Sequence, residues 1–171
     1  MSIGKLLLFG AAIGLAAPGL GAAEKPETAR AALERAKPRA KEWRADAILT
    51  NASTLGADAN GTAEIWNFAF YSPGAKTWLN VTASGGKLGT LEVSMGLADP
   101  VGEFIDSDQA IEAAKKNGLA GSKKPMMGLA WMGGSKDGVA CWTVGGGFEP
   151  GSVGVVLDAK TGGFITKHET P

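Results

Sequence analysis

The stretch GVACWTVGGGFEPGSVGVVLDAKTGG, residues 138–163, decides the fold, because an earlier stretch has the same pattern of turns. Residues 61–86 read GTAEIWNFAFYSPGAKTWLNVTASGG, and the Pro-Gly and Gly-Gly pairs of the two stretches are each 77 residues apart. Trp66 and Trp142 are 76 residues apart. Backbone dihedral angles favour Pro and Gly at turns, and Trp is highly buried on average. The pattern predicts one supersecondary unit used twice, with strands separated by a Pro-Gly turn and a Gly-Gly turn.

The residues around these two stretches predict an α+β fold in which each unit is one helix followed by four antiparallel strands. Apolar residues at steps of three and four favour a first helix between Glu24 and Arg44, which Pro38 either kinks or divides in two. Asp106 and Gln109 have the spacing of a capping box, and Asn117-Gly118 ends the second helix. Strands are expected at residues 47–55, around Trp66, 78–81, 88–93, 126–132, 139–144, 153–158 and 164–167.

The chain divides into four predicted segments. Residues 1–23 have one Lys, an uncharged apolar run and small residues before a cleavage position, a pattern typical of a signal peptide. Residues 24–95 form the first helix-plus-sheet unit, 96–105 a linker, and 106–171 the second unit. Two tandem units, each with a helix packed on its own four-stranded sheet, are therefore expected in an exported protein of the periplasm or the extracellular space.

Charge and cysteine content narrow the classes of function. Without residues 1–23 the chain has 16 basic and 17 acidic residues, because Lys5 is the one charged residue in that segment. This balance does not favour nucleic acid as a partner, and no membrane span is expected once the signal is removed. Cys141 is the single cysteine, so no internal disulfide can form, and stability must come from the core.

The second unit resembles the PepSY family. Its final hairpin, VGVVLDAKTGGFI, is similar to the family pattern V-x-V-D-A-x-T-G-x-V, and DSDQAIEAAKKNG resembles the family's opening helix. The likeness covers about residues 105–167 and is looser over the first unit, where TASGG stands in place of DAKTGG. It implies a cystatin-like α+β fold in exported or membrane proteins, binding to envelope components or restraint of peptidases, and no catalytic residues.

Residues with reactive or ligating side chains are few. Cys141 and His168 could form a thiol dyad only if the fold brought them together. No pair of Cys or His has zinc-ligand spacing, and neither a metal nor a cofactor is expected. Asp158 and Gly162 are interpreted as structural residues of a turn, in which the carboxylate accepts backbone N–H groups and the glycine adopts a left-handed conformation. The chain is therefore not expected to be an enzyme.

Aromatic residues supply the remaining candidates for a site. Trp43, Phe70, Trp78 and Trp131 are candidate binding residues, although aromatic side chains at alternating strand positions are more often core. The favoured function is a non-enzymatic module that binds a protein or peptide partner in the envelope on its concave sheet face or a sheet edge, with peptidase restraint as one form. The alternative is a carrier of a small apolar ligand or sugar in an aromatic-lined pocket between the units. Neutral net charge and an open sheet edge also favour self-association.

Overall fold

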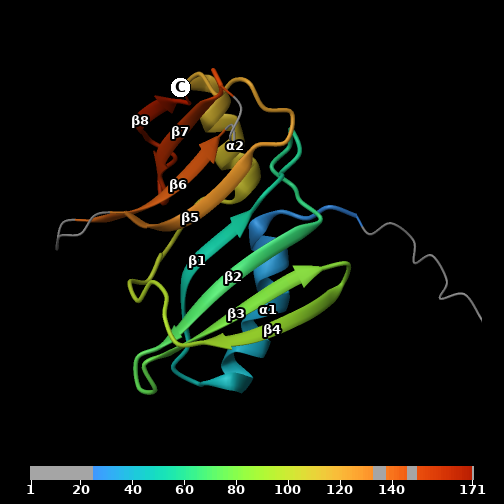
Figure 1. The fold of residues 1–171 in the computed structure, drawn as a ribbon, viewed down its shortest axis with the longest axis vertical. Coiled ribbons are helices and arrows are strands. Elements are labelled where there is room, and N and C mark those ends of the chain that lie inside the picture. Colours follow the sequence, from blue (N-terminus) through green and yellow to red (C-terminus); the bar gives the residue numbers. More distant parts are fainter. Residues whose placement is uncertain (1–24, 133–137, 146–149, 171) are drawn as a thin grey trace, which may run out of the picture.

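In the part of the chain that the structure describes, two helices and eight antiparallel strands form an α+β fold, and both helices lie behind the sheet in Figure 1. The computed structural model describes residues 25–132, 138–145 and 150–170, so the predicted signal peptide lies outside the described residues. The helices are α1 (Ala29–Trp43) and α2 (Ser107–Lys116). The strands are β1 (Ile48–Thr54), β2 (Ile65–Ser72), β3 (Thr77–Ser84), β4 (Lys87–Val93), β5 (Met126–Met132), β6 (Val139–Gly145), β7 (Val153–Asp158) and β8 (Phe164–Glu169). All ten elements were predicted within a few residues of these bounds.

The strands form one continuous sheet in the order β4-β3-β2-β1-β5-β6-β7-β8, so the prediction of two separate four-stranded sheets is wrong. In each half of the chain the first strand, β1 or β5, lies at one edge of its four strands. If the halves formed separate sheets, β1 and β5 would both expose unpaired backbone N–H and C=O groups. They pair with each other instead, with Ala52 opposite Leu129 and Ser53 opposite Gly128, which removes two open edges.

Helix α1 continues through Pro38 as one helix of 15 residues. The buried face of the helix consists of alanine residues and Leu33, and these small side chains allow it to approach β2 and β3 closely. Thr28 caps its first turn by accepting a hydrogen bond from the amide of Ala31. Helix α2 begins with the predicted capping box of Asp106 and Gln109, and it packs on β6 and β7.

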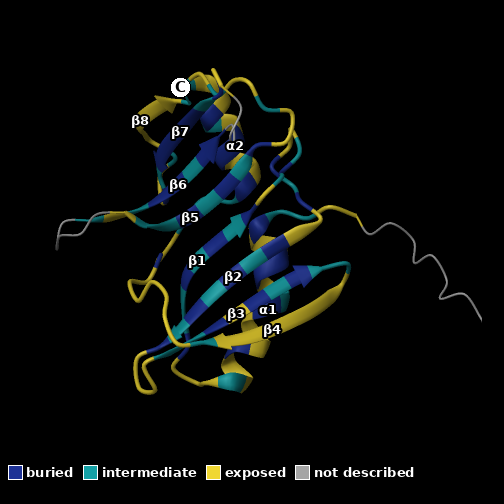
Figure 2. Cartoon of the chain, in the orientation of Figure 1, coloured by how far each residue is buried: buried dark blue, intermediate teal, exposed yellow. Residues whose placement is uncertain are grey.

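The core lies between the helices and one face of the sheet. Strands β2 and β3 alternate between buried and more exposed residues, as the colours in Figure 2 show, whereas β4 and β8 are exposed along nearly all their length. Trp66 and Trp142 meet edge to face at the centre, with ring centroids 6.4 Å apart. Trp66 donates its indole N–H to the carbonyl of Glu27 and Trp142 to that of Ile105, in each case the residue before a helix cap. One buried tryptophan thus anchors the start of each helix.

The two helices meet at their N-termini, and Asp106 contributes to capping both. Its Oδ1 accepts hydrogen bonds from the amide of Ser107 at 2.7 Å and from the amide of Arg30, in α1, at 2.9 Å. The hydroxyl of Ser107 in turn accepts the amide of Ala29 at 2.9 Å. Helix N-termini carry partial positive charge, so one carboxylate offsets the repulsion between two of them.

Glycine allows the close approach of β6 and β7. A Cβ atom on Gly145 would lie 2.5 Å from the Cα of Gly154, which is impossible without a backbone shift. Gly128 in β5 differs, because a Cβ there would meet no atom within 4 Å. Replacing glycine by alanine should therefore disturb the packing at Gly145 in β6 and leave it undisturbed at Gly128 in β5.

Candidate functional site: the open face of the sheet

The four aromatic residues proposed as binding residues do not form one site. Phe70 is buried in the core at 3% exposure, and Trp131 points to the same side of the sheet from the end of β5. Trp43, at the end of α1, donates its indole N–H to Glu92. Trp78 alone of the four lies on the sheet face without helices, which we call the open face.

Trp78 is half-buried, and its ring is enclosed. It stacks on Tyr71 with centroids 4.8 Å apart, and a Cβ on Gly96 would lie 2.8 Å from its Cδ1 atom. Its indole N–H donates to the carbonyl of Leu97 at 2.7 Å. Trp78 therefore holds the segment after β4 against the sheet. The aromatic rings between the two halves of the chain pack on one another in the core and do not line the ligand pocket expected there; they belong to Trp66, Phe68, Phe104 and Trp142.

Small uncharged side chains cross the middle of the open face. Strand pairing places Ser53 between Asn67 and Gly128, and the same row continues to Thr82 and Thr143 on the outer sides. The adjacent row contains Asn51, Ala69, Asn80, Leu91, Ala130 and Cys141. Larger side chains follow at the strand ends, such as Tyr71 on one side and Met126 on the other. The difference in side-chain volume, added to the twist of the sheet, makes the middle of this face concave.

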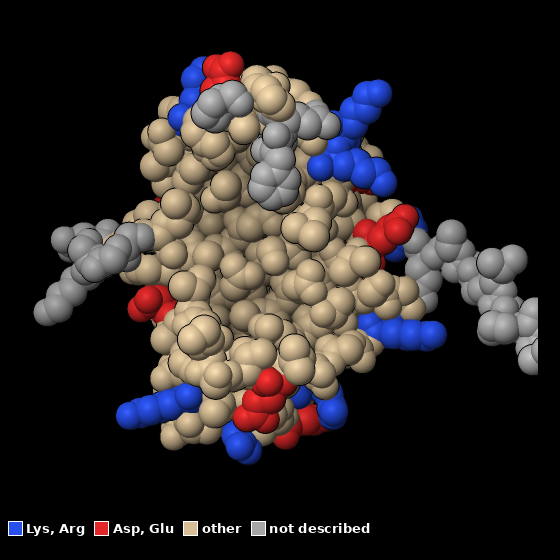
Figure 3. Space-filling model, viewed as in Figure 1, with Lys and Arg blue, Asp and Glu red and all other residues tan. Residues whose placement is uncertain are grey.

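Two neighbouring hollows occupy this middle region and share Ser53. The first, of about 510 Å³, extends over β1 to β4, and the second, of about 300 Å³, extends over β5 and β6 toward His168. Among the residues that the structure describes, neither hollow is lined by Asp, Glu, Lys or Arg. Figure 3 shows the open face: outside the atoms drawn in grey, the middle is hollowed and tan, and the charged side chains lie around the periphery.

The two hollows differ in chemistry. The amides of Asn51, Asn67 and Asn80 line the first, and Thr82 donates its hydroxyl to Oδ1 of Asn67 at 2.8 Å. In the part of the chain that the structure describes, no protein group hydrogen-bonds the side-chain amides of Asn51 and Asn80. The second hollow is more apolar, and Met126, Met127 and Leu55 contribute to its lining. The open face thus offers hydrogen-bonding groups on one half and thioether side chains on the other.

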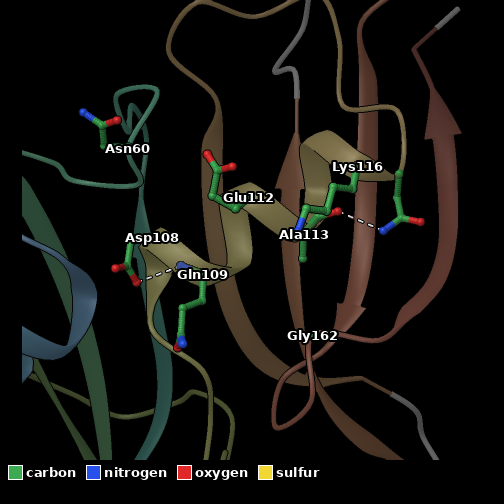
Figure 4. Close-up of a pocket in the computed structure, with 8 residues that line it drawn as sticks. Asn60, Asp108, Gln109, Glu112, Ala113, Lys116 and Gly162 are labelled. Carbon is green, nitrogen blue, oxygen red and sulfur yellow. Dashed lines mark hydrogen bonds between the residues drawn. The ribbon is translucent and has the colours of Figure 1, made fainter.

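A third hollow lies on the helix side, beside α2, with a volume of about 680 Å³. Figure 4 shows Asp108, Gln109 and Glu112 projecting from that helix, with Asn60 and Gly162 on neighbouring loops. Its polar groups are largely engaged by their own helix: Glu112 pairs with Lys115, Asp108 accepts the amide of Gln109, and Asn117 donates to the carbonyl of Ala113. This hollow therefore leaves fewer groups available to a ligand than the open face does.

Cys141 and His168 are not brought together. Cys141 of β6 pairs with Asp158 of β7, whereas His168 of β8 pairs with Gly154 of β7. Asp158 and Gly154 are four residues apart in β7, which separates the two pairs by roughly 13 Å along the strand. Burial raises the pKa of the Cys141 thiol, and the carboxylate of Asp158 raises it further. His168 is therefore not placed to act as the base for this thiol, and the raised pKa disfavours the thiolate form that a nucleophile needs.

Asp158 is engaged in the turn between β7 and β8. Its Oδ1 accepts hydrogen bonds from the amides of Lys160 and Thr161 and from the hydroxyl of Thr161, and Gly162 has a φ of 71°. The hydrogen bond from the Thr161 side chain is the main cause of a lowered pKa for this carboxyl. Among the described residues no cluster of His, Cys, Asp and Glu could hold a metal ion, and no helix is long and apolar enough to cross a membrane.

The residues that line the two hollows of the open face are absent from the sequence-based binding candidates, of which Trp78 alone lies on this face. Asn51, Asn67 and Asn80 occupy strand positions that alternate with buried residues, which is also the pattern of any solvent-facing side of a sheet. The available signal was the lack of Lys and Glu at these positions, because charged residues are common on solvated strand faces. That signal becomes visible only once the rows across the sheet are known.

Comparison with known proteins shows a shared fold. No family model and no curated protein matches the chain. The crystal structure of CD1622, assigned as a lipoprotein, from Clostridium difficile 630 superposes with a TM-score of 0.55 at 15% identity, covering 80% of this chain and 91% of that one. The C-terminal domain of YpeB from Bacillus megaterium gives a TM-score of 0.34 at 13% identity, covering 90% of this chain and 70% of that one. The fold of this chain is therefore similar to that of CD1622.

Proposed function

We propose that this chain is a non-enzymatic binding module of the cell envelope, which holds a polypeptide segment of a partner protein on the open face of its sheet. The observation that carries the proposal is the pair of adjoining hollows that extend from β4 to His168 of β8 and whose described lining is free of Asp, Glu, Lys and Arg. A sheet face that is exposed to solvent commonly contains Lys and Glu, whereas the core of a binding interface is depleted of charged residues. A concave middle without Lys and Glu therefore favours a binding surface.

Location outside the cytoplasm is part of the same proposal. It is supported by the signal-peptide pattern of residues 1–23 and by the similarity of the second half to PepSY domains. The assignment of CD1622 as a lipoprotein agrees with it. We further propose that the two halves are tandem PepSY-like units, divided as residues 24–95 and 106–171, which have merged their sheets. Restraint of a peptidase is the specific form of binding that the resemblance favours.

The structure favours a polypeptide over a sugar or an apolar small molecule. Sugar rings bind against accessible aromatic faces, but the ring of Trp78 is enclosed between Tyr71 and Gly96, and Phe68 is 1% exposed. Met126, on the open face of β5, adapts to apolar side chains of different shapes, as methionines do on other peptide-binding surfaces.

A matched pair of variants tests the proposal in a capture experiment from the source organism's envelope fraction. Gly128→Gln adds a neutral side chain in the middle of the hollow region, where its Cβ would meet no atom within 4 Å, and Ala31→Gln introduces the same residue on the exposed side of α1. We expect the chain from Glu24 onward and Ala31→Gln to retain the same partner and Gly128→Gln to lose it. A partner retained equally by all three would place the binding surface elsewhere and contradict the proposal.

A further inference from the structure

The chemistry of the open face restricts what it can bind. Across both hollows the described lining offers amide, hydroxyl, thioether and apolar groups, and His168 is the one titratable side chain among these described residues. A charged ligand would lose its hydration there without finding an opposite charge, which costs several kcal/mol per ion. The face therefore selects against charge.

The side-chain amides of Asn51 and Asn80 indicate which groups a ligand should carry. Asn51 and Asn80 flank Ala69 in one row, and each amide group has two donors and a carbonyl acceptor. Such pairs match the N–H and C=O of a peptide group or of an Asn or Gln side chain. The second hollow lies beside Met126 and therefore favours an apolar side chain at a different point of the ligand.

The direction and length of the site follow from the sheet. The hollows lie side by side across the strands, and neighbouring strands are ~4.8 Å apart, so the distance from β4 to β8 is roughly 34 Å. An extended peptide of about ten residues covers that distance at ~3.3 Å per residue.

Resting on the proposed function, we infer that the ligand is an uncharged polypeptide segment of about ten residues that crosses the strands, with amide-rich residues over Asn51 and Asn80 and an apolar side chain over Met126. Because no ion pair contributes, its affinity is nearly independent of salt concentration. A ligand recognised by the charged periphery would bind in another position and with strong salt dependence.

Selection from a random dodecapeptide display library, with the chain from Glu24 onward as bait, tests this inference. We expect the enriched peptides to lack Asp, Glu, Lys and Arg over about ten residues and to contain Asn, Gln, Ser or Thr next to a Leu, Ile, Met or Phe. The dissociation constant of a synthetic copy should change less than about twofold between 50 mM and 500 mM NaCl.

Two variants locate the binding. Gly128→Gln should weaken the selected peptide at least ~tenfold, with Ala31→Gln unchanged. Asn80→Asp adds a charge at an exposed position that does not affect folding, and it should weaken binding by a similar factor. Charged or salt-sensitive peptides that still depend on Gly128 would overturn the inference and leave the proposed function standing. If the selected peptides bind Gly128→Gln and Asn80→Asp as well as the parent chain, both the inference and the proposed function are wrong.

Discussion

Asp106 should contribute more to stability than an ordinary helix cap, because it accepts amides from two helices. Replacing a capping Asp by Ala costs about 1 kcal/mol, and the charge near a helix N-terminus adds about 0.3–1 kcal/mol. In Asp106→Ala the amide of Arg30 in α1 also loses its acceptor, at 2.9 Å in the native structure. The site is partly exposed, so water replaces some of this hydrogen bond. We expect a total loss of about 2–3 kcal/mol, which is about 4–12 °C in Tm for a chain of this length.

The assay is urea unfolding at pH 7, with Asp108→Ala as the matched control. Asp108 also lies in the first turn of α2, but its carboxylate accepts an amide only from Gln109. We expect Asp108→Ala to cost less than about 1 kcal/mol. Asp106→Asn keeps an acceptor oxygen and removes the charge, so its cost should lie between those of the two alanine variants.

Hydrogen exchange supplies the discriminating measurement. If Asp106 caps both helices, Asp106→Ala must accelerate exchange at the amide of Arg30, 76 residues earlier in the chain, more than at amides in the middle of α1. An unchanged Arg30 amide, or a loss of stability no larger than that of Asp108→Ala, would refute the shared cap.

Four further outcomes are expected. Gly145→Ala should lower the unfolding free energy by more than about 2 kcal/mol in urea titrations, whereas Gly128→Ala should be neutral or stabilising, and equal effects would contradict the packing described for β6. Because the folded-state pKa of Asp158 is lowered, its stabilising contribution is present above its ordinary pKa of 3.8 and is lost as the pH falls through the folded-state value; urea unfolding between pH 6 and pH 2.5 should show a smaller acid-induced loss for Asp158→Asn than for the parent chain. Cys141 should react with iodoacetamide at pH 8 at least ~tenfold more slowly in the native protein than in urea, and equal rates would show that the thiol is accessible. Leu91→Lys, on the exposed edge strand β4, should reduce concentration-dependent association in analytical ultracentrifugation without lowering Tm, and unchanged association would place the contact elsewhere.

The elements of this fold could be predicted because their signals are local. The capping box of Asp106 and Gln109, the alternation of Trp66, Phe68 and Phe70, and the Pro-Gly and Gly-Gly turns each depend on residues within one element or its neighbour. The joining of the two halves has no such signal. Nothing in the residues of β1 indicates that Ser53 pairs with Gly128, 75 positions later, in preference to leaving an edge. A pairing without a connecting turn is decided by the global arrangement of strands.

The candidate site was missed for a related reason. Large aromatic side chains are conspicuous in a sequence, and here most of them stabilise the core or hold loops, as Trp66, Trp142 and Trp78 do. The open face is made instead by what is small or uncharged. Asn51 and Asn80 are ordinary polar residues of separate strands until the sheet places them on either side of Ala69. A concave uncharged surface therefore depends on which residues of neighbouring strands lie side by side. The sequence along one strand does not show these cross-strand neighbours.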